Sequence, residues 1–157
     1  TSPSIDIQIS SNFERLIYDV TKDSEYIKKI MDDLISKKNY VLKTDIISVI
    51  KKHFSAYSIN QDEVTLLINS LFTEKKITID PHTAVGLAAS RKNKSSQYID
   101  VILSTAHPTK FKDTVTPIIN DESYVTDRVR QIINLDETMT VLKNDEAVVR
   151  NFILENI

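Results

Sequence analysis

The stretch Ile99-Asp100-Val101-Ile102-Leu103-Ser104-Thr105-Ala106-His107-Pro108 decides the fold class. An apolar run ends in a polar cluster at the point where a buried strand, expected over 98–103, passes into a helix. In open α/β sheets the carboxyl ends of parallel strands face a shared crevice in which ligands bind. The hydroxyl groups of Ser104 and Thr105 are therefore expected at the edge of such a crevice.

The same kind of junction occurs twice more along the chain. An expected strand over 5–9 runs into Ser10-Ser11-Asn12, and an expected strand over 77–79 runs into Asp80-Pro81-His82-Thr83. Each junction is followed by a stretch in which apolar residues recur at helical spacing. Three junctions of this kind predict one shared crevice, and the predicted fold class is α/β, with few parallel strands flanked by helices.

Helical signals dominate between the first two junctions. Apolar residues at three-and-four spacing predict helices over most of 11–75. The pair Asp80-Pro81 is typical of a helix start, which predicts a helix over 81–91. Small residues such as Gly86 leave little bulk on that helix, and this favours close packing on a sheet or under a ligand. After Pro117 the pattern indicates only short helices and turns.

Composition limits the function classes. The chain has 157 residues, of which 41% are hydrophobic and 27% charged, as expected for one globular domain. A net charge of -2 argues against a nucleic-acid surface. There is no cysteine, and only one glycine, which excludes a glycine-rich phosphate loop. No apolar run approaches the roughly 20 residues of a membrane helix, so we expect no membrane partner and a cytoplasmic location.

Each candidate site residue has a plain structural alternative. Ser104 or Thr105 can bind a ligand atom or cap the helix that follows. Asp80 can act as a general base, although an aspartate before proline is more often an N-cap. His82 and His107 lie at junctions where an imidazole can meet a phosphate or move a proton. Metal binding is not expected, because no cluster of ligands has suitable spacing.

The first helix start offers a second kind of site. Ser10, Ser11, Asn12 and Arg15 could together hold an anion, because backbone amides and the helix dipole favour negative charge there. The alternative is simple capping, with Arg15 in solvent. A small-anion-binding module without enzymatic activity is therefore the alternative function, and a structural remnant of the same fold is a further one.

Three segments, in order, resemble successive motifs of threonine synthase: 7–15 (IQISSNFER), 80–86 (DPHTAVG) and 103–111 (LSTAHPTKF). The resemblance implies the C-terminal part of an enzyme of pyridoxal-phosphate fold type II, the tryptophan synthase β group. Such enzymes convert O-phosphohomoserine and water to threonine and phosphate, and the cofactor acts as an electron sink. The resemblance also implies that residues 1–119 belong to the cofactor-binding large domain, with a helical insertion at about 21–75, and that 120–157 form a helical extension.

The resemblance assigns roles to six residues. Ser104 or Thr105 would face the pyridine nitrogen of the cofactor, and a neutral hydroxyl there would leave that nitrogen largely unprotonated. The substrate side of the crevice would be lined or supported by Ser11, Asn12, His82 and Thr83.

The family's Schiff-base lysine and its glycine-rich loop belong to motifs that these 157 residues do not show, and the chain does not begin with Met. We therefore expect a piece of a longer protein that lacks the catalytic lysine, is inactive alone, and needs an N-terminal portion as its partner. The segment from Pro108 to Asp113 faintly echoes the lysine motif, but its context is wrong, and we interpret Lys112 as a decoy. Exposed apolar surface in such a piece could also produce a homo-oligomer.

Overall fold

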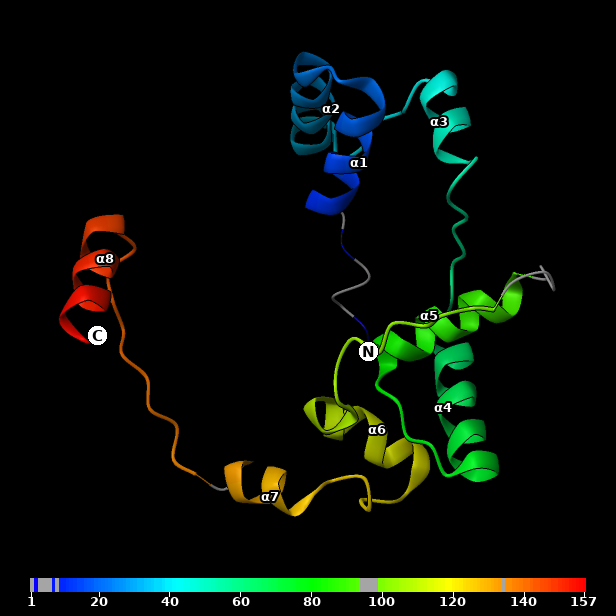
Figure 1. The fold of residues 1–157 in the computed structure, drawn as a ribbon, viewed down its shortest axis with the longest axis vertical. Coiled ribbons are helices and arrows are strands. Elements are labelled where there is room, and N and C mark those ends of the chain that lie inside the picture. Colours follow the sequence, from blue (N-terminus) through cyan, green and yellow to red (C-terminus); the bar gives the residue numbers. More distant parts are fainter. Residues whose placement is uncertain (1, 3–6, 8, 94–98, 134) are drawn as a thin grey trace. The chain divides into compact units, whose positions relative to one another are not determined.

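The computed structural model describes residues 2, 7, 9–93, 99–133 and 135–157. Its helices are shown in Figure 1, and their bounds are α1 Ser11–Thr21, α2 Ser24–Lys37, α3 Thr44–Ile50, α4 Gln61–Lys75, α5 Pro81–Lys92, the 3₁₀ helix η1 Pro108–Phe111, α6 Lys112–Ile119, α7 Asp127–Ile133 and α8 Glu146–Glu155. Contacts divide the chain into two compact units, Thr1–Tyr124 and Val125–Ile157.

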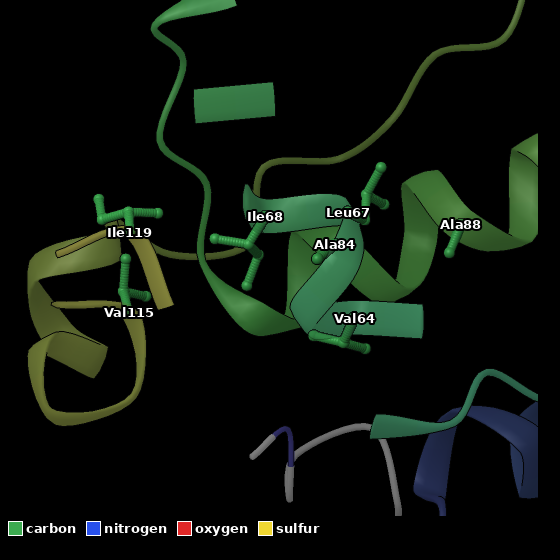
Figure 2. Packing of buried hydrophobic residues seen from close by; sticks show 7 residues of the cluster. All are labelled: Val64, Leu67, Ile68, Ala84, Ala88, Val115 and Ile119. Atoms are coloured by element: carbon green, nitrogen blue, oxygen red, sulfur yellow. The ribbon is translucent and has the colours of Figure 1, made fainter. Parts of the chain in front are cut away.

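The main core of the first unit is built by α4, α5 and α6. Helix α4 packs on both α5 and α6, and η1 packs on α6. Figure 2 shows the buried side chains that these helices bring together: Val64, Leu67, Ile68, Ala84, Ala88, Val115 and Ile119. Ile68 and Val115 are fully buried. Burial of such side chains is the main contribution that holds the site-bearing end of α5 in place.

A second, smaller cluster joins α1 and α2. Its buried members are Ile17 of α1 and Ile27 and Ile30 of α2. Helix α1 also contacts α3. The three-and-four spacing of the apolar residues predicts this packing, and the expected helices over most of 11–75 are confirmed.

The helix ends follow the capping signals of the sequence. Side chains of Ser10, Asp23, Asn60 and Asp80 accept hydrogen bonds from the first turns of α1, α2, α4 and α5. Asn60 and Glu63 form a reciprocal capping box. The residues that follow α1, α2, α4 and α6 adopt positive φ: Lys22, Lys38, Lys76 and Asn120.

The expected strands are not formed within the described residues. Residues 77–79 and 99–103 have no strand assignment, and most of 5–9, together with Tyr98, lies outside the part of the chain that the structure describes. A strand requires a neighbour whose backbone groups pair with its own. None of the described segments supplies that neighbour, so the α/β sheet that the apolar runs predict is absent from this part of the chain.

The segment 99–103 nevertheless keeps the alternation of a strand. Ile102 lies over Gly86 of α5, where a Cβ added to the glycine would be 3.5 Å from the Ile102 Cγ2. Ile99, Val101 and Leu103 are 93%, 83% and 77% exposed. One face of the segment therefore packs on α5 and the other carries apolar side chains in solvent.

Two further features complete the fold. The second unit carries α7 and α8, joined by residues without regular structure among those described. Among the described helices, none combines the length and apolar character needed to cross a membrane. The packing units divide at 124/125, whereas the sequence predicted domains 1–119 and 120–157; the roles assigned to those domains stay predictions.

Candidate functional site

The candidate site is built around Asp80, a fully buried carboxylate at the start of α5. Its Oδ1 accepts a hydrogen bond from the His82 backbone N–H at 2.9 Å, and its Oδ2 accepts one from the Thr83 backbone N–H at 3.4 Å. The Thr83 hydroxyl also donates to Oδ2, and His82 Nδ1 lies 3.0 Å from Oδ1. Asp80 is thus an N-cap, as the Asp-Pro pair predicts, and its burial does not suit an accessible general base.

The end of the third junction meets this carboxylate. The Thr105 backbone N–H donates to the Thr83 hydroxyl oxygen at 3.2 Å. The Thr105 hydroxyl donates to Asp80 Oδ1 at 3.5 Å, a long contact between residues 25 positions apart in sequence. The second and third predicted junctions therefore lie together. We call Asp80, His82, Thr83 and Thr105 the Asp80 cluster.

Hydrogen bonds keep Asp80 ionised in spite of its burial. Burial raises the pKa of this carboxyl, but the hydrogen bonds from Thr83 and His82 lower it, and the sum places the pKa of Asp80 below its ordinary value. Hydrogen bonds to the charged form of an acid favour that form. The cluster therefore contains a carboxylate, which accepts hydrogen bonds and cannot donate one.

The His82 side chain is buried and supports the site from inside the fold, and it does not line the cavity described below. It is 5% exposed, and its ring packs on Phe111 with 4.6 Å between ring centroids. Because an ionised carboxylate only accepts, the Nδ1 that faces it carries the proton. The buried Nε2 has no hydrogen-bond partner among the described residues.

A cavity of about 820 Å³ opens beside the cluster, in the first unit. Ser104 is exposed and lines it, whereas Thr105 is not among its lining residues. The other lining residues come from α4 and the segment after it, from the segment that leads into η1, and from the turn after α6: Phe72, Lys76, Thr78, Ala106, His107, Pro108, Asp121, Ser123 and Tyr124. Ligand sites of drug-sized molecules commonly have volumes of about 300 to 1,000 Å³.

Sequence reasoning missed the charged part of this lining. Hydrogen bonds from the Ser123 hydroxyl and backbone, together with the nearby Lys76 ammonium, lower the pKa of Asp121. Lys76 Nζ lies 5.1 Å from the centre of the Phe72 ring. An aspartate two residues before a serine is a local turn signal that could have pointed to Asp121, but only tertiary packing brings it to Ser104.

The first junction has a simpler structure than predicted. Ser10 caps α1, and the Asn12 side chain accepts a hydrogen bond from the Arg15 guanidinium. Ser11 and Asn12 are exposed, and no hydrogen bond or ion pair of the described residues joins them to the Asp80 cluster. Their assignment to a substrate site stays a prediction. Capping accounts for the polar residues at this helix start.

Lys112 lies outside the cavity lining. It begins α6, and its Nζ pairs with Glu122 Oε1 at 2.9 Å. His107 caps η1, with its Nδ1 2.7 Å from the Thr109 hydroxyl. Across the described residues, no group of three or more His, Cys, Asp or Glu side chains could hold a metal ion.

Comparison with solved structures defines the class of fold. The chain aligns over 98% of its length with 33% of a PLP-bound threonine synthase from Brucella melitensis, at 32% identity and a TM-score of 0.81. It aligns over 98% of its length with 35% of the yeast threonine synthase, at 26% identity and a TM-score of 0.75. The fold is therefore that of about one third of a pyridoxal-phosphate enzyme.

Sequence comparisons specify the relationship further. Residues 83–153 match the family model described as threonine synthase, C-terminal. A curated threonine synthase from Pseudomonas aeruginosa is 27% identical over 99% of this chain and 34% of its own length. The chain is thus a relative of the threonine synthases, which confirms the resemblance carried by the three motifs. It spans about a third of the length of these three relatives.

Proposed function

We propose that this chain forms the C-terminal part of a threonine synthase that converts O-phosphohomoserine and water to threonine and phosphate. The observation that carries the proposal is the Asp80 cluster, in which two of the motifs that resemble those of threonine synthase meet through Thr105 and Thr83 beside a cavity. The similarity to a PLP-bound threonine synthase over nearly the whole chain supports it.

The proposal includes the sheet that the described residues do not form. The extended segments 77–79 and 99–103 become parallel strands of an α/β sheet of PLP fold type II, completed by an N-terminal portion. The exposed apolar face of 99–103 supports this proposal, because a buried parallel strand carries apolar residues on both faces. Residues 1–119 then belong to the cofactor-binding domain and 120–157 to a helical extension.

The residues present fit the proposed cofactor. The cavity has the volume of a site for a small aromatic ligand, and the hydroxyl of Ser104 and the rings of Phe72 and Tyr124 line it. Pyridoxal phosphate supplies, when bound, the electron-withdrawing ring that stabilises negative charge on the substrate. In the proposal, the hydroxyl of Ser104 or Thr105 holds the ring nitrogen.

The remaining residues orient and support this site. His82 and Thr83 support the end of the proposed strand over 99–103: both side chains contact the Asp80 carboxylate, and the Thr83 hydroxyl oxygen accepts the Thr105 backbone N–H. Ser11 and Asn12 are proposed for the substrate side. A cytoplasmic location belongs to the same proposal.

Reduction with borohydride tests where the lysine that carries the cofactor lies. The chain alone is incubated with pyridoxal phosphate, reduced, and analysed by intact mass and peptide mapping. We expect no stoichiometric adduct on Lys112, because Lys112 is paired with Glu122 and lies outside the cavity lining. The matched control is Lys112→Arg, which should behave like the parent chain. A stoichiometric adduct on Lys112 that this variant abolishes would show that the catalytic lysine lies in this chain.

Complementation tests the activity. The chain is mixed with the N-terminal portion of a threonine synthase and assayed for cofactor absorption and for phosphate release from O-phosphohomoserine. Each part alone should show neither signal, and the mixture should show both. Calorimetry with inorganic phosphate addresses the alternative of a small-anion-binding module: saturable binding to the chain alone, with no gain on mixing, would favour that alternative.

A further inference from the structure

Lys76 brings a positive charge to the cavity. Among the described residues that line the cavity, it is the one lysine or arginine. Lys76 is exposed, and no salt bridge found in the described part of the chain includes it. Its ammonium lies over the ring of Phe72, which lines the same cavity. The charge of Lys76 is therefore open to a molecule that enters.

Two further hydrogen-bond donors line the cavity. His107 Nδ1 accepts the Thr109 backbone N–H at 3.3 Å, so the proton of the neutral imidazole lies on Nε2, which can donate. The Ser104 hydroxyl can donate as well. An ammonium with neighbouring neutral donors is suited to an anion that has several acceptor oxygens.

Asp121 is the acidic side chain in the described lining. Its carboxylate accepts a hydrogen bond from the Ser123 backbone N–H at 2.6 Å, and the Ser123 hydroxyl also bonds to it. Lys76 is near enough to help to lower the pKa of Asp121, which is therefore ionised. This negative charge should weaken the binding of an anion at Lys76, and removing it should strengthen that binding.

We propose that Lys76 is a substrate-binding residue that recognises the phosphate group of the substrate, with His107 and Ser104 as neighbouring donors. This inference rests on the proposed function, in which the substrate is a phosphate monoester and phosphate is a product. Such a group carries roughly 1.5 to 2 negative charges near pH 7. It therefore gains more from the Lys76 ammonium than a carboxylate with a single charge would.

Steady-state kinetics of the holoenzyme assembled from this chain and its N-terminal portion test the inference. Lys76→Gln should raise the KM for O-phosphohomoserine by about tenfold or more, because a hydrogen bond to a charged group is lost. The inhibition constant of inorganic phosphate should rise by a similar factor, while the cofactor absorption stays unchanged. Lys76→Arg should retain most of the binding, and Asp121→Asn should lower both constants.

Lys75→Gln is the matched control. It removes the same charge from the neighbouring residue, which lies in the last turn of α4 and outside the cavity lining. A lysine at a helix end can also act by offsetting the helix dipole. Such a role would give the two glutamine variants similar effects on urea unfolding and no difference in KM. The inference requires that KM and phosphate inhibition change in Lys76→Gln alone.

The outcomes separate this inference from the proposed function. Equal kinetic constants in the two glutamine variants would overturn the inference, while the activity of the parent holoenzyme would uphold the proposed function. A parent assembly that releases no phosphate would overturn the proposed function, and the chain alone then decides the inference.

For that measurement the chain alone is titrated with inorganic phosphate at constant ionic strength and followed by ¹H–¹⁵N NMR. The amide resonances of Lys76 and Ser104 should shift saturably in the parent and in Lys75→Gln, but not in Lys76→Gln. No saturable shift in the parent would overturn the inference. Shifts confined to Ser11 and Asn12 would also overturn it, and would favour anion binding at the start of α1.

Discussion

At the residue scale, Asp80 combines two tasks that are usually separate. It caps α5 through the backbone N–H groups of His82 and Thr83, and it receives the side chains of Thr83 and Thr105. An exposed N-cap typically contributes about 1 kcal/mol. A buried one also satisfies donors that would otherwise lose their partners, which costs about 1 to 3 kcal/mol for each group left unpaired.

Asp80→Ala is therefore expected to lower the free energy of unfolding of the chain by about 2 kcal/mol or more. Asp80→Asn should cost less, because the amide oxygen still caps the helix. Urea unfolding followed by circular dichroism measures both variants. Equal effects of Ala and Asn would show that the hydrogen bonds of the cap contribute little.

Acid should lower the free energy of unfolding of the parent chain through protonation of Asp80. The pKa of Asp80 is lower in the folded chain than its ordinary value, so folding favours the ionised form. The resulting stability is fully present above the unfolded pKa of about 3.9, and it is lost as the pH falls through the lower folded pKa. Unfolding curves between pH 6 and pH 2.5 should show a smaller acid loss in Asp80→Asn than in the parent. An equal loss of stability with falling pH in the parent and in Asp80→Asn would contradict the lowered pKa of Asp80 in the folded chain.

At the element scale, local signals were sufficient for the helices and insufficient for the strands. The pair Asp80-Pro81 predicted a helix start, and the apolar spacing over 11–75 predicted helices, and the structure confirms both. The expected strands depended on pairing partners that the described residues do not supply. The contact of Thr105 with Asp80 joins residues 25 positions apart, and no local pattern encodes it.

Gly86 provides a test of how tightly 99–103 packs on α5. In Gly86→Ala, the new Cβ would meet Ile102 Cγ2 at 3.5 Å, an ordinary van der Waals contact. Alanine is also favoured over glycine in a helix by about 0.8 to 1 kcal/mol. We expect the variant to be more stable than the parent chain by about 0.5 to 1 kcal/mol in urea unfolding. The reverse exchange, Ala89→Gly in the same helix, should be destabilising. Loss of stability in Gly86→Ala would mean that 99–103 packs more closely on α5.

At the scale of the whole molecule, the first unit carries an apolar stripe in solvent. Ile99, Val101 and Leu103 project from one face of an extended segment. Contiguous exposed apolar patches mark surfaces that are buried by a partner or that cause association. In the proposed function the partner is the N-terminal portion of the enzyme, and in the isolated chain a second copy can take its place.

The isolated chain should therefore associate as its concentration rises. Sedimentation velocity is expected to show a weight-average mass that increases with concentration, and Val101→Ser should weaken that dependence. Val41→Ser is the matched control, because Val41 is 86% exposed but lies outside the stripe. A parent chain that stays monomeric over the whole range, or equal effects of the two substitutions, would argue against association through this stripe.

The residues with positive φ that end several helices affect the thermal stability of the chain. Lys22, Lys38 and Lys76 terminate their helices at positive φ, where a side chain costs roughly 1 to 2 kcal/mol relative to glycine. The chain contains one glycine, Gly86, and it lies inside α5. A glycine at Lys22 or at Lys38, which are both exposed and absent from the cavity lining, is therefore expected to raise thermal resistance without altering the site.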